Sequence, residues 1–259
     1  MACSLIDALD ARRGIVCAVG AGGKKTTLHR ILAEHPGRVG LTATVMSTLP
    51  DQDIVDQRLI ATPSELRQSV PAAAMHHHRV AFAAPGHKPG RFAGLDPDAV
   101  AELHRLGRFD VTLVKADGAR MRGIKAPRAD EPAVVPGCTT LISVVSAAVI
   151  GEALDERVAH RTERLADLLD TSIGTPVTAA HIGRLLSSAH GHRQHLGTAR
   201  HIAVINQVDD AGRLLQARDA ARIALSSATP PERVVLASMT AAQPIVEILQ
   251  PSSGGEVGA

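Results

Sequence analysis

The chain has 259 residues, of which 45% are hydrophobic and only 1% are aromatic, and its 28 basic and 26 acidic residues give a formal net charge of +2. This near-neutral charge, without aromatic side chains that could stack on bases, argues against nucleic acid as the main partner. The early Asp7 and Asp10 argue against a signal peptide, and the longest apolar run falls short of the ~20 residues that span a bilayer, which argues against a membrane partner.

Three scattered cysteines, Cys3, Cys17 and Cys138, are too few for a disulfide framework or a cysteine-based metal site. They fit a reducing compartment, and we expect a cytoplasmic protein. The length suits one large α/β domain over residues 1–250. Whether the helices between 151 and 200 form a sub-lobe stays open, and the Gly/Ser-rich tail over 251–259 is predicted to be disordered.

Taken in chain order, the first half alternates apolar strand runs with helical patterns. Apolar runs predict strands over residues 15–19, 39–44, 80–84 and 109–116. A helix is predicted over 25–34, a second one starting at Thr62-Pro63-Ser64-Glu65 in an ambiguous segment, and a third capped by Asp96-Pro97 and ending at Leu106. The segment 85–94 is predicted to be a loop.

In the second half, residues 118–140 hold many Gly, Pro, Lys and Arg residues and predict a long functional loop rather than a regular element. Further strands are predicted over 141–147, 201–208 and 233–237, and helices over 161–170, 178–189, 212–226 and 242–249. Apolar strands that alternate with helices indicate a mainly parallel sheet covered on both faces, a three-layer α/β fold. Ligands in such folds gather at the carboxyl ends of the strands.

The segment GAGGKKTT follows the first apolar strand and precedes a helix. Glycines allow backbone N–H groups to turn around an anion, and the helix presents its positive N-terminal end there, so a phosphate-binding loop is predicted. A lysine adds charge and a hydroxyl can hold Mg²⁺. The predicted nucleotide-binding residues are Gly20, Ala21, Gly22, Gly23, Lys24, Lys25, Thr26 and Thr27.

The match to G-x-x-x-x-G-K-[ST] is imperfect. With Lys24 as the phosphate lysine the first glycine would fall at Ala18, and with Lys25 it would fall at Val19. The sequence does not decide which lysine contacts the phosphate. Thr26 is predicted as the metal ligand, with Thr27 as the alternative, and a plain glycine turn between strand and helix is the alternative to the whole site.

Two further polar clusters end predicted strands. Asp117 follows the apolar run at 111–116, as the magnesium-organising aspartate of P-loop proteins does, although a plain Asp-Gly turn is the alternative. Residues 205–209, INQVD, resemble the N-K-x-D turn with which GTPases bind the base, so Asn206 and Asp209 are candidate base contacts. Alternatively, Asp209 or Asp210 only caps the following helix, which we favour.

Other polar residues offer weaker signals. Arg120, Arg122, Lys125 and Arg128 lie close together in the long loop, where they suit a phosphate or a phosphorylated pterin, or form a solvated surface. Thr42 and Thr44 share a strand face and could reach a metal or phosphate, although ordinary strand packing is favoured. The run of histidines at 76–78 cannot easily supply three ligands to one metal.

Together these segments resemble the YqeC-like accessory proteins that are associated with selenium-dependent molybdenum hydroxylases. The resemblance spans about residues 15–210. Its most specific residues match the family run E-A-D-G-S-R…K-A-P…E-P and are Asp117, Gly118, Arg120, Lys125, Ala126, Pro127, Glu131 and Pro132; His160, Arg161 and Glu163 match a weaker signature. The resemblance implies a P-loop-type nucleotide-binding fold and a part in the maturation of a molybdenum-cofactor enzyme.

The chain also departs from that pattern. Lys115 stands where the family usually has glutamate, two residues before Asp117, and residues i and i+2 share a strand face. A cation there would weaken Mg²⁺ binding and would remove a candidate base, unless Lys115 extends its ammonium to solvent. Lys115 therefore argues against nucleotide hydrolysis more than against nucleotide binding. Ala119, Gln207 and the doubled lysine are further departures.

We therefore expect a protein that binds ATP or GTP with Mg²⁺ and serves a molybdenum hydroxylase client. The predicted catalytic residues are Lys24, Lys25, Asp117, Arg120 and Lys125, with Thr26 and Asp117 at the metal. Arg120 and Lys125 would stabilise charge on the transferred phosphate or bind an acidic cofactor. The alternatives are a carrier or chaperone that holds a molybdopterin-type ligand without turnover, and a nucleotidyltransferase that acts on molybdopterin.

Overall fold

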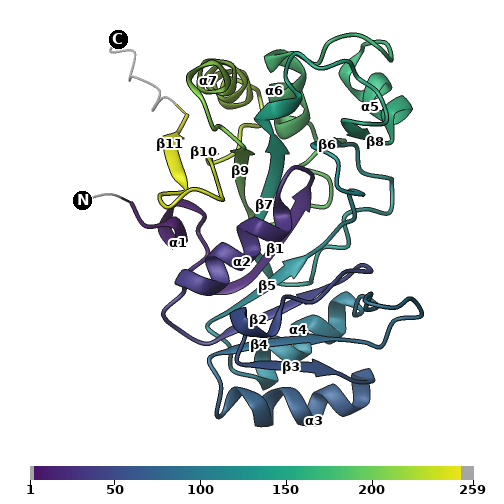
Figure 1. Cartoon of the computed structure of the whole chain (residues 1–259), viewed down its shortest axis with the longest axis vertical. Coiled ribbons are helices and arrows are strands. Elements are labelled where there is room, and N and C mark those ends of the chain that lie inside the picture. The colour runs from purple at the N-terminus through teal and green to yellow at the C-terminus, as the bar shows by residue number, and fades with distance from the viewer. Residues whose placement is uncertain (1–2, 252–259) are drawn as a thin grey trace, which may run out of the picture.

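The computed structural model describes residues 3–251, and its centre is a nine-stranded sheet (Figure 1). The strand order is β11-β10-β9-β7-β1-β5-β2-β4-β3, and all neighbours are parallel except β10 and β11. The strands are β1 Gly14–Gly20, β2 Val39–Ala43, β3 Gln57–Ile60, β4 Arg79–Ala83, β5 Val111–Lys115, β7 Cys138–Ser146, β9 Arg200–Asn206, β10 Arg233–Ala237 and β11 Ile245–Leu249. A second, two-stranded sheet pairs β6 (Ile124–Lys125) with β8 (Ala159–His160).

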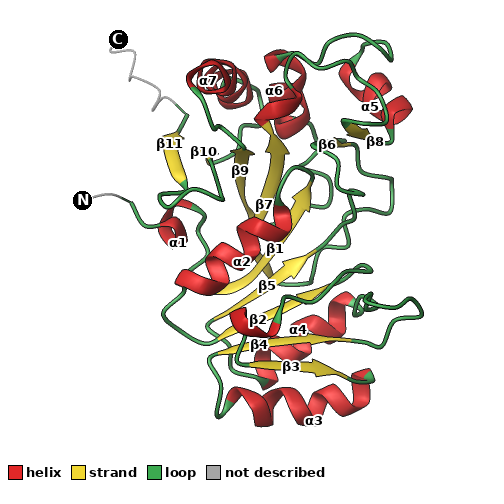
Figure 2. Cartoon of the chain, viewed as in Figure 1, coloured by secondary structure: helices red, strands yellow, loops and turns green. Residues whose placement is uncertain are grey.

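Helices connect the strands and lie on both sides of the large sheet (Figure 2). They are α1 Leu5–Ala8, α2 Lys24–Glu34, α3 Pro63–Ala74, α4 Pro97–Leu106, α5 Thr162–Leu169, α6 Ala179–Ser187 and α7 Ala211–Leu225, with short 3₁₀ turns η1 Gln52–Ile54 and η2 Ala147–Val149. No helix within residues 3–251 combines the length and apolar character needed to cross a membrane. The fold is thus the predicted three-layer α/β arrangement around a mainly parallel sheet.

Successive side chains of each strand point to opposite faces of the sheet, which divides the core into layers. In β1, Val16 and Ala18 pack with α1 and α2, whereas Ile15, Cys17 and Val19 pack with α3 and α4 on the other face. A third cluster joins α5, α6 and α7 to β7, β9 and β10. The helices between 151 and 200 therefore share an apolar core with the sheet.

Local signals explain several of the helix starts. Thr62 accepts from the backbone N–H of Glu65, and the Glu65 side chain accepts from the N–H of Thr62, so the predicted start of α3 is a capping box. Asp96 caps α4 with Pro97 in its first turn, as predicted. Asp210 caps α7, so this capping role does not occupy Asp209.

Two sequence-based predictions are wrong at the sheet edges. The helix predicted over 242–249 is strand β11, which pairs antiparallel with β10 and leaves all of its residues partly exposed. Strand β3 was not predicted, because its residues QRLI are polar or half exposed at the opposite edge. The loop predicted over 118–140 contains the short strand β6 and runs three residues into β7, which begins at Cys138. Residues 252–259 of the tail predicted to be disordered lie outside the described residues.

The strand order determines where the polar loops meet. Because β5, β1, β7 and β9 are parallel neighbours, their carboxyl ends lie along one edge of the sheet. Asp117 follows β5, the glycine segment follows β1, and Asn206 ends β9. The three predicted polar clusters therefore come together in one region.

Candidate functional site

The phosphate loop, defined as residues 20–27, turns directly from β1 into α2. Gly20, Gly22 and Gly23 all have positive φ, which glycine adopts readily. A Cβ on Gly23 would collide with the side-chain nitrogen of Asn206, and one on Gly20 would collide with the carbonyl oxygen of Val144. The glycines therefore allow the backbone to lie close against the ends of β7 and β9.

The backbone N–H groups of the phosphate loop fall into two sets. Those of residues 20–22 bind within the protein: Gly20 N donates to Asp117 Oδ2 at 2.9 Å, Ala21 N to Val144 O at 2.8 Å and Gly22 N to Arg122 O at 3.0 Å. In the part of the chain that the structure describes, the N–H groups of residues 23–26 have no protein acceptor. The expected ring of amides is thus reduced to four N–H groups at the N-terminus of α2.

Lys24 lies beneath the phosphate loop, with a side chain that is 4% exposed. Its Nζ is 2.9 Å from Asp117 Oδ1 and donates to the carbonyl oxygen of Gly20. Asp117 also accepts from Lys125 Nζ at 2.8 Å. The carboxylate that sequence analysis assigned to the metal therefore binds two ammonium groups and one backbone N–H.

These contacts begin a buried ion chain, defined as Lys24, Asp117, Lys125, Glu131 and Arg161. Lys125 Nζ is 2.6 Å from Glu131 Oε2. Arg161 binds the Glu131 carboxylate through both terminal nitrogens, at 2.8 and 2.7 Å. Residues matched by the sequence resemblance thus connect the phosphate loop to the start of α5.

Burial and charge compete along this chain. Burial raises the pKa of the Asp117 carboxyl, but the charges of Lys24 and Lys125 outweigh it, and the net pKa is lowered. Burial also raises the pKa of Glu131, and Arg161 and Lys125 outweigh it to lower that pKa to about 2. Both carboxyl groups are therefore ionised at neutral pH. Burial lowers the pKa of Lys24, an effect that Asp117 opposes.

The structure gives Lys125 a different setting from the one expected. Its side chain is buried between two carboxylates, so contact with a transferred phosphate would require opening these ion pairs. Arg120 is exposed, with positive φ, in the 118–123 turn, whose Arg122 carbonyl accepts from Gly22 N. Arg120 is therefore the better placed of the two for an incoming ligand.

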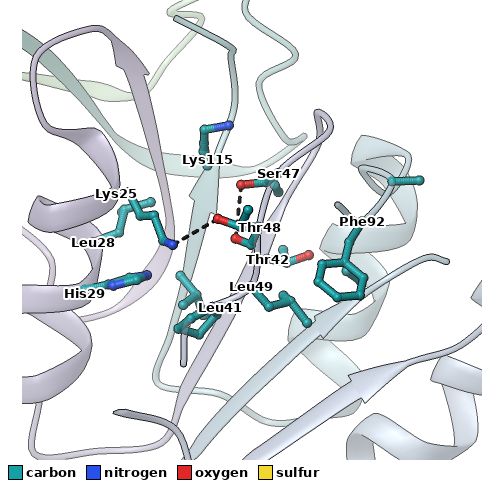
Figure 3. A pocket seen from close by; sticks show the side chains of 14 residues that line it. Lys25, Leu28, His29, Leu41, Thr42, Ser47, Thr48, Leu49, Phe92 and Lys115 are labelled. Carbon is teal, nitrogen blue, oxygen red and sulfur yellow. Dashed lines mark hydrogen bonds between the residues drawn. The ribbon is translucent and has the colours of Figure 1, made fainter. Parts of the chain in front are cut away.

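Lys25, on the exposed side of α2, and Lys115, at the end of β5, line one pocket beside α2 (Figure 3). Lys25 Nζ donates to Thr48 Oγ1 at 2.9 Å, and Lys115 Nζ donates to Met46 O at 3.4 Å. Strand β5 ends at Lys115, so the i, i+2 rule that placed Lys115 beside Asp117 does not extend to Asp117. Burial, together with the charge of Lys24, lowers the pKa of Lys115 to about 8.

The two threonines at the start of α2 are not equivalent. Thr27 is buried and its hydroxyl donates to Gly23 O at 3.1 Å. Thr26 is exposed, and its hydroxyl has no hydrogen-bond partner within residues 3–251. Thr42 and Thr44 donate to the carbonyl oxygens of Phe82 and Ala133, which supports their interpretation as structural residues.

No group of three or more His, Cys, Asp or Glu side chains that could hold a metal ion occurs among the described residues. His76, His77 and His78 follow α3; His76 and His78 are exposed and His77 is half-buried. Any Mg²⁺ at the phosphate loop would therefore take most of its oxygen ligands from phosphate and water, with Thr26 as the available protein hydroxyl.

Asn206 connects the phosphate loop to the neighbouring strand ends. Its Nδ2 donates to Gly22 O at 2.8 Å, and its Oδ1 accepts from Met239 N at 3.0 Å. Asp209 accepts from the Ser238 hydroxyl at 2.6 Å and pairs with Arg213 at 3.1 Å. Asn206 thus shapes the loop, and Asp209 lies at the carboxyl end of β9 and β10.

The sequence pattern predicted Lys24 and Asp117 as site residues but did not predict the contacts that enclose them. His192 is buried with its Nε2 3.3 Å from Lys125 O, and burial lowers its pKa to about 4. Gln194 donates to the carbonyl oxygens of Arg128 and Glu131. No local pattern marks these two residues, because they act through contacts with segments more than sixty residues away.

Comparisons with known proteins agree with the resemblance in the sequence. The chain is similar to the uncharacterized protein YqeC of Escherichia coli strain K12, with 27% identity over 162 residues. The match covers 61% of this chain and 61% of that protein's length. A family model described as YqeC protein matches residues 16–163, which include the phosphate loop, Asp117 and Arg161. Because this match spans more than half of the chain, the protein belongs to the YqeC family.

Proposed function

We propose that this protein binds a nucleoside triphosphate with Mg²⁺ at the phosphate loop. One observation carries the proposal: within residues 3–251, four backbone N–H groups at the start of α2 have no protein acceptor, and the first residue of that helix is Lys24, whose ammonium contacts Gly20 O in the same loop. Such groups bind phosphate oxygens through hydrogen bonds and the positive end of the helix dipole. Lys24 rather than Lys25 is then the phosphate lysine.

Ligand binding would rearrange the ion pairs of Lys24. A phosphate at the free N–H groups attracts the ammonium away from Asp117 or shares it with Asp117. Asp117 remains neutralised by Lys125 and by the N–H of Gly20. Thr26 would then be the protein residue that holds Mg²⁺, and Asp117, already paired with Lys125, would act on the ion only through a water.

The nucleotide would extend from the phosphate loop toward β9 and β10. Asn206 contacts the loop itself, and Asp209 lies beyond it with a carboxylate that a base N–H could reach if Arg213 moves. A carboxylate favours guanine, whose N1–H and N2 amino group can donate to both of its oxygens, over adenine, whose Watson–Crick edge offers only the N6 amino group. We therefore expect GTP to bind more tightly than ATP.

Phosphoryl transfer at such a site depends on positioning and on electrostatic stabilisation. Lys24 and Arg120 would neutralise charge on the transferred group, and Lys125 would hold Asp117 in place. A non-catalytic carrier that holds a molybdopterin-type ligand is the second candidate. It is favoured by the full neutralisation of Asp117, since two lysines leave that carboxylate a weak base.

The biological role follows from the resemblance to accessory proteins of selenium-dependent molybdenum hydroxylases. We propose that the nucleotide-dependent state of the loop over 118–136 regulates contact with a molybdenum hydroxylase client or with its cofactor. This loop is the segment that the buried ion chain joins to the phosphate site. Client binding that does not respond to nucleotide would contradict this part of the proposal.

The test is a thermal-shift panel with ATP, GTP and CTP, with and without Mg²⁺, on the parent protein and on Lys24→Met and Lys25→Ala. A ligand at 100 times its dissociation constant adds about 2.7 kcal/mol to the unfolding free energy. We expect this shift in the parent and in Lys25→Ala, and its loss in Lys24→Met. Equal shifts in all three proteins, or none in the parent, would refute the assignment.

Product analysis separates the chemical alternatives. A hydrolase releases orthophosphate from the bound nucleotide, a nucleotidyltransferase releases pyrophosphate, and a carrier releases neither. Because removing Lys24 leaves part of the charge of Asp117 uncompensated, circular dichroism of Lys24→Met must first show a folded protein. Asn206→Ala gives a second variant, since it removes a contact to the loop without removing a buried charge.

A further inference from the structure

A pocket lies beside α2, on the side of the phosphate loop that faces away from Asn206 (Figure 3). It is formed by the first turns of α2, the carboxyl ends of β2, β4 and β5, and residues 47–50 and 92–93. The enclosed cavity is small, about 30 Å³, and it opens to solvent. A cavity of this size takes only a small group, so the rest of a ligand would lie in the open mouth.

The polar side of this pocket is positively charged. Lys25 of α2 and Lys115 of β5 both line it, and neither makes an ion pair with a carboxylate within residues 3–251. Arg91 lies close enough for its charge to contribute to lowering the pKa of Lys115. Asp51, the acidic residue whose charge is felt by the neighbouring His29, is exposed and pairs with neither lysine. Among the described residues, two lysines therefore line the cavity without a carboxylate in direct contact, and the charge of Asp117 acts on Lys115 only from a distance.

The remaining walls are apolar or carry neutral hydroxyls. Leu28, Leu41, Leu49, Pro50 and Phe92 line the pocket, and Ser47 and Thr48 add hydroxyl groups next to the lysines. Burial lowers the pKa of His29 to about 4, so its ring is neutral at physiological pH and adds no charge. The lining thus pairs an oxyanion-binding end with a surface for an apolar body.

We propose that this pocket binds a second ligand, a small organic oxyanion, whose carboxylate or phosphate group contacts Lys25 and Lys115 and whose apolar part packs against Phe92 and Leu49. The pocket is separated from the base-binding side by β1 and the phosphate loop. A ligand there would lie beside the terminal phosphate of a bound nucleotide, as a second substrate would. This role as a second substrate rests on the proposed function. The doubled lysine then has two roles, Lys24 for the nucleotide and Lys25 for the second ligand.

The test uses the small number of lysines in the chain, which are Lys24, Lys25, Lys88, Lys115 and Lys125. Reductive ¹³C-methylation keeps their charge and gives each accessible lysine its own NMR signal, which Lys→Arg variants assign. The probes are inorganic phosphate, acetate and benzoate, titrated against sodium chloride at equal ionic strength, with and without ADP and Mg²⁺. Comparing the affinities of phosphate and acetate identifies the preferred oxyanion. Comparing those of benzoate and acetate measures the effect of an apolar body.

We expect the Lys25 and Lys115 signals to follow one saturable curve, while the signal of Lys88, which lies outside the pocket, does not move. Lys25→Ala and Lys115→Ala should each weaken the binding of the anion about tenfold, the effect of losing one charged hydrogen bond, and Lys88→Ala should leave it unchanged. Benzoate should bind more tightly than acetate, and Phe92→Ala should remove that difference.

Two results would overturn the proposal. In the first, the Lys25 and Lys115 signals move no more than that of Lys88. In the second, saturation by phosphate disappears when ADP and Mg²⁺ occupy the protein, which would place the anion on the phosphate loop instead. An anion response without any nucleotide response would support the pocket and refute the proposed function, so the two failures are distinguishable.

Discussion

Lys24 and Lys25 are neighbours in sequence but have opposite surroundings. The Lys24 side chain is 4% exposed and contacts Asp117, whereas Lys25 is exposed and contacts only the Thr48 hydroxyl. Successive residues of a helix project about 100° apart, so the first turn of α2 directs one lysine under the loop and the other toward the pocket. To bind a phosphate, Lys24 would have to release or share Asp117, whereas Lys25 has no carboxylate partner among the described residues.

The largest expected effect on stability concerns the buried ion chain. Glu131→Gln removes the carboxylate that neutralises Lys125 and Arg161, and we expect it to lower the unfolding free energy by about 3 kcal/mol. Urea denaturation measures this loss. The matched control is Glu247→Gln, which breaks a half-exposed ion pair with Arg218 and should cost less than about 1 kcal/mol. Equal losses would contradict the structural role of the buried ion chain.

The same substitution has a pH signature. The pKa of Glu131 is lowered from 4.5 to about 2, against the raising effect of burial, by Arg161 and Lys125. A carboxyl with a depressed folded pKa contributes stability above its unfolded pKa and loses it as pH falls through the folded one. The parent should therefore lose more stability than Glu131→Gln between pH 4.5 and pH 2. Parallel pH curves for the two proteins would show that Glu131 is not paired as described.

A smaller effect on stability is expected in the phosphate loop, at the glycine directly before the two lysines. Gly23 has a φ of 131°, and a Cβ there would collide with Asn206, so Gly23→Ala should cost about 2 kcal/mol and abolish nucleotide stabilisation. Gly174 also has positive φ, but its surroundings are open. Gly174→Ala should therefore cost only about 1 kcal/mol from backbone strain and should retain the nucleotide response.

Substitution of Lys115 is expected to stabilise the folded protein. Burial, with the charge of Lys24, lowers the folded pKa of Lys115 from 10.5 to about 8, so its protonated form disfavours folding. Lys115→Met should raise the unfolding free energy by about 1 kcal/mol at pH 7, after discounting for solvent screening. The unfolded chain binds more protons between pH 8 and pH 10.5, so the parent should gain stability there and the difference should shrink. Destabilisation at pH 7 would show that Lys115 has a structural partner.

The smallest effect distinguishes the adjacent threonines. Thr26→Ala should change the unfolding free energy by less than about 0.5 kcal/mol, because its hydroxyl is exposed and has no partner within residues 3–251. It should nevertheless weaken the Mg²⁺ dependence of nucleotide binding. Thr27→Ala, the control, should cost about 1 kcal/mol through the lost hydrogen bond to Gly23. Calorimetric titration of Mg²⁺ in the presence of nucleotide compares the two.

The sequence predicted most of the sheet and its helices because buried strands and capped helices have strong local patterns. It failed where tertiary pairing decides the structure. Ile245, Ile248 and Leu249 have helical spacing, but antiparallel pairing with β10 makes them a strand. Strand β3 lies at the other edge, where half-exposed polar residues leave no apolar pattern.

The candidate site was predictable only in part. The glycines, Lys24 and Asp117 follow strands directly, so their meeting at one sheet edge could be inferred from the topology. The pairing of Glu131 with Arg161 joins residues thirty positions apart. The i, i+2 rule placed Lys115 beside Asp117, but β5 ends at Lys115, and the pairing with Lys24 and Lys125 then decides the direction of Asp117.

The contacts of His192, Gln194 and Asn206 have a consequence for how the chain can be divided. The family match ends at residue 163, yet these three side chains come from later in the sequence and bind carbonyl oxygens at positions 125, 128, 131 and 22. Strands β9 and β10 also lie beyond that boundary. A fragment truncated at the family boundary would expose one side of β7 and would lack the residues that brace the central loops. We therefore expect a fragment that ends at residue 163 not to fold on its own.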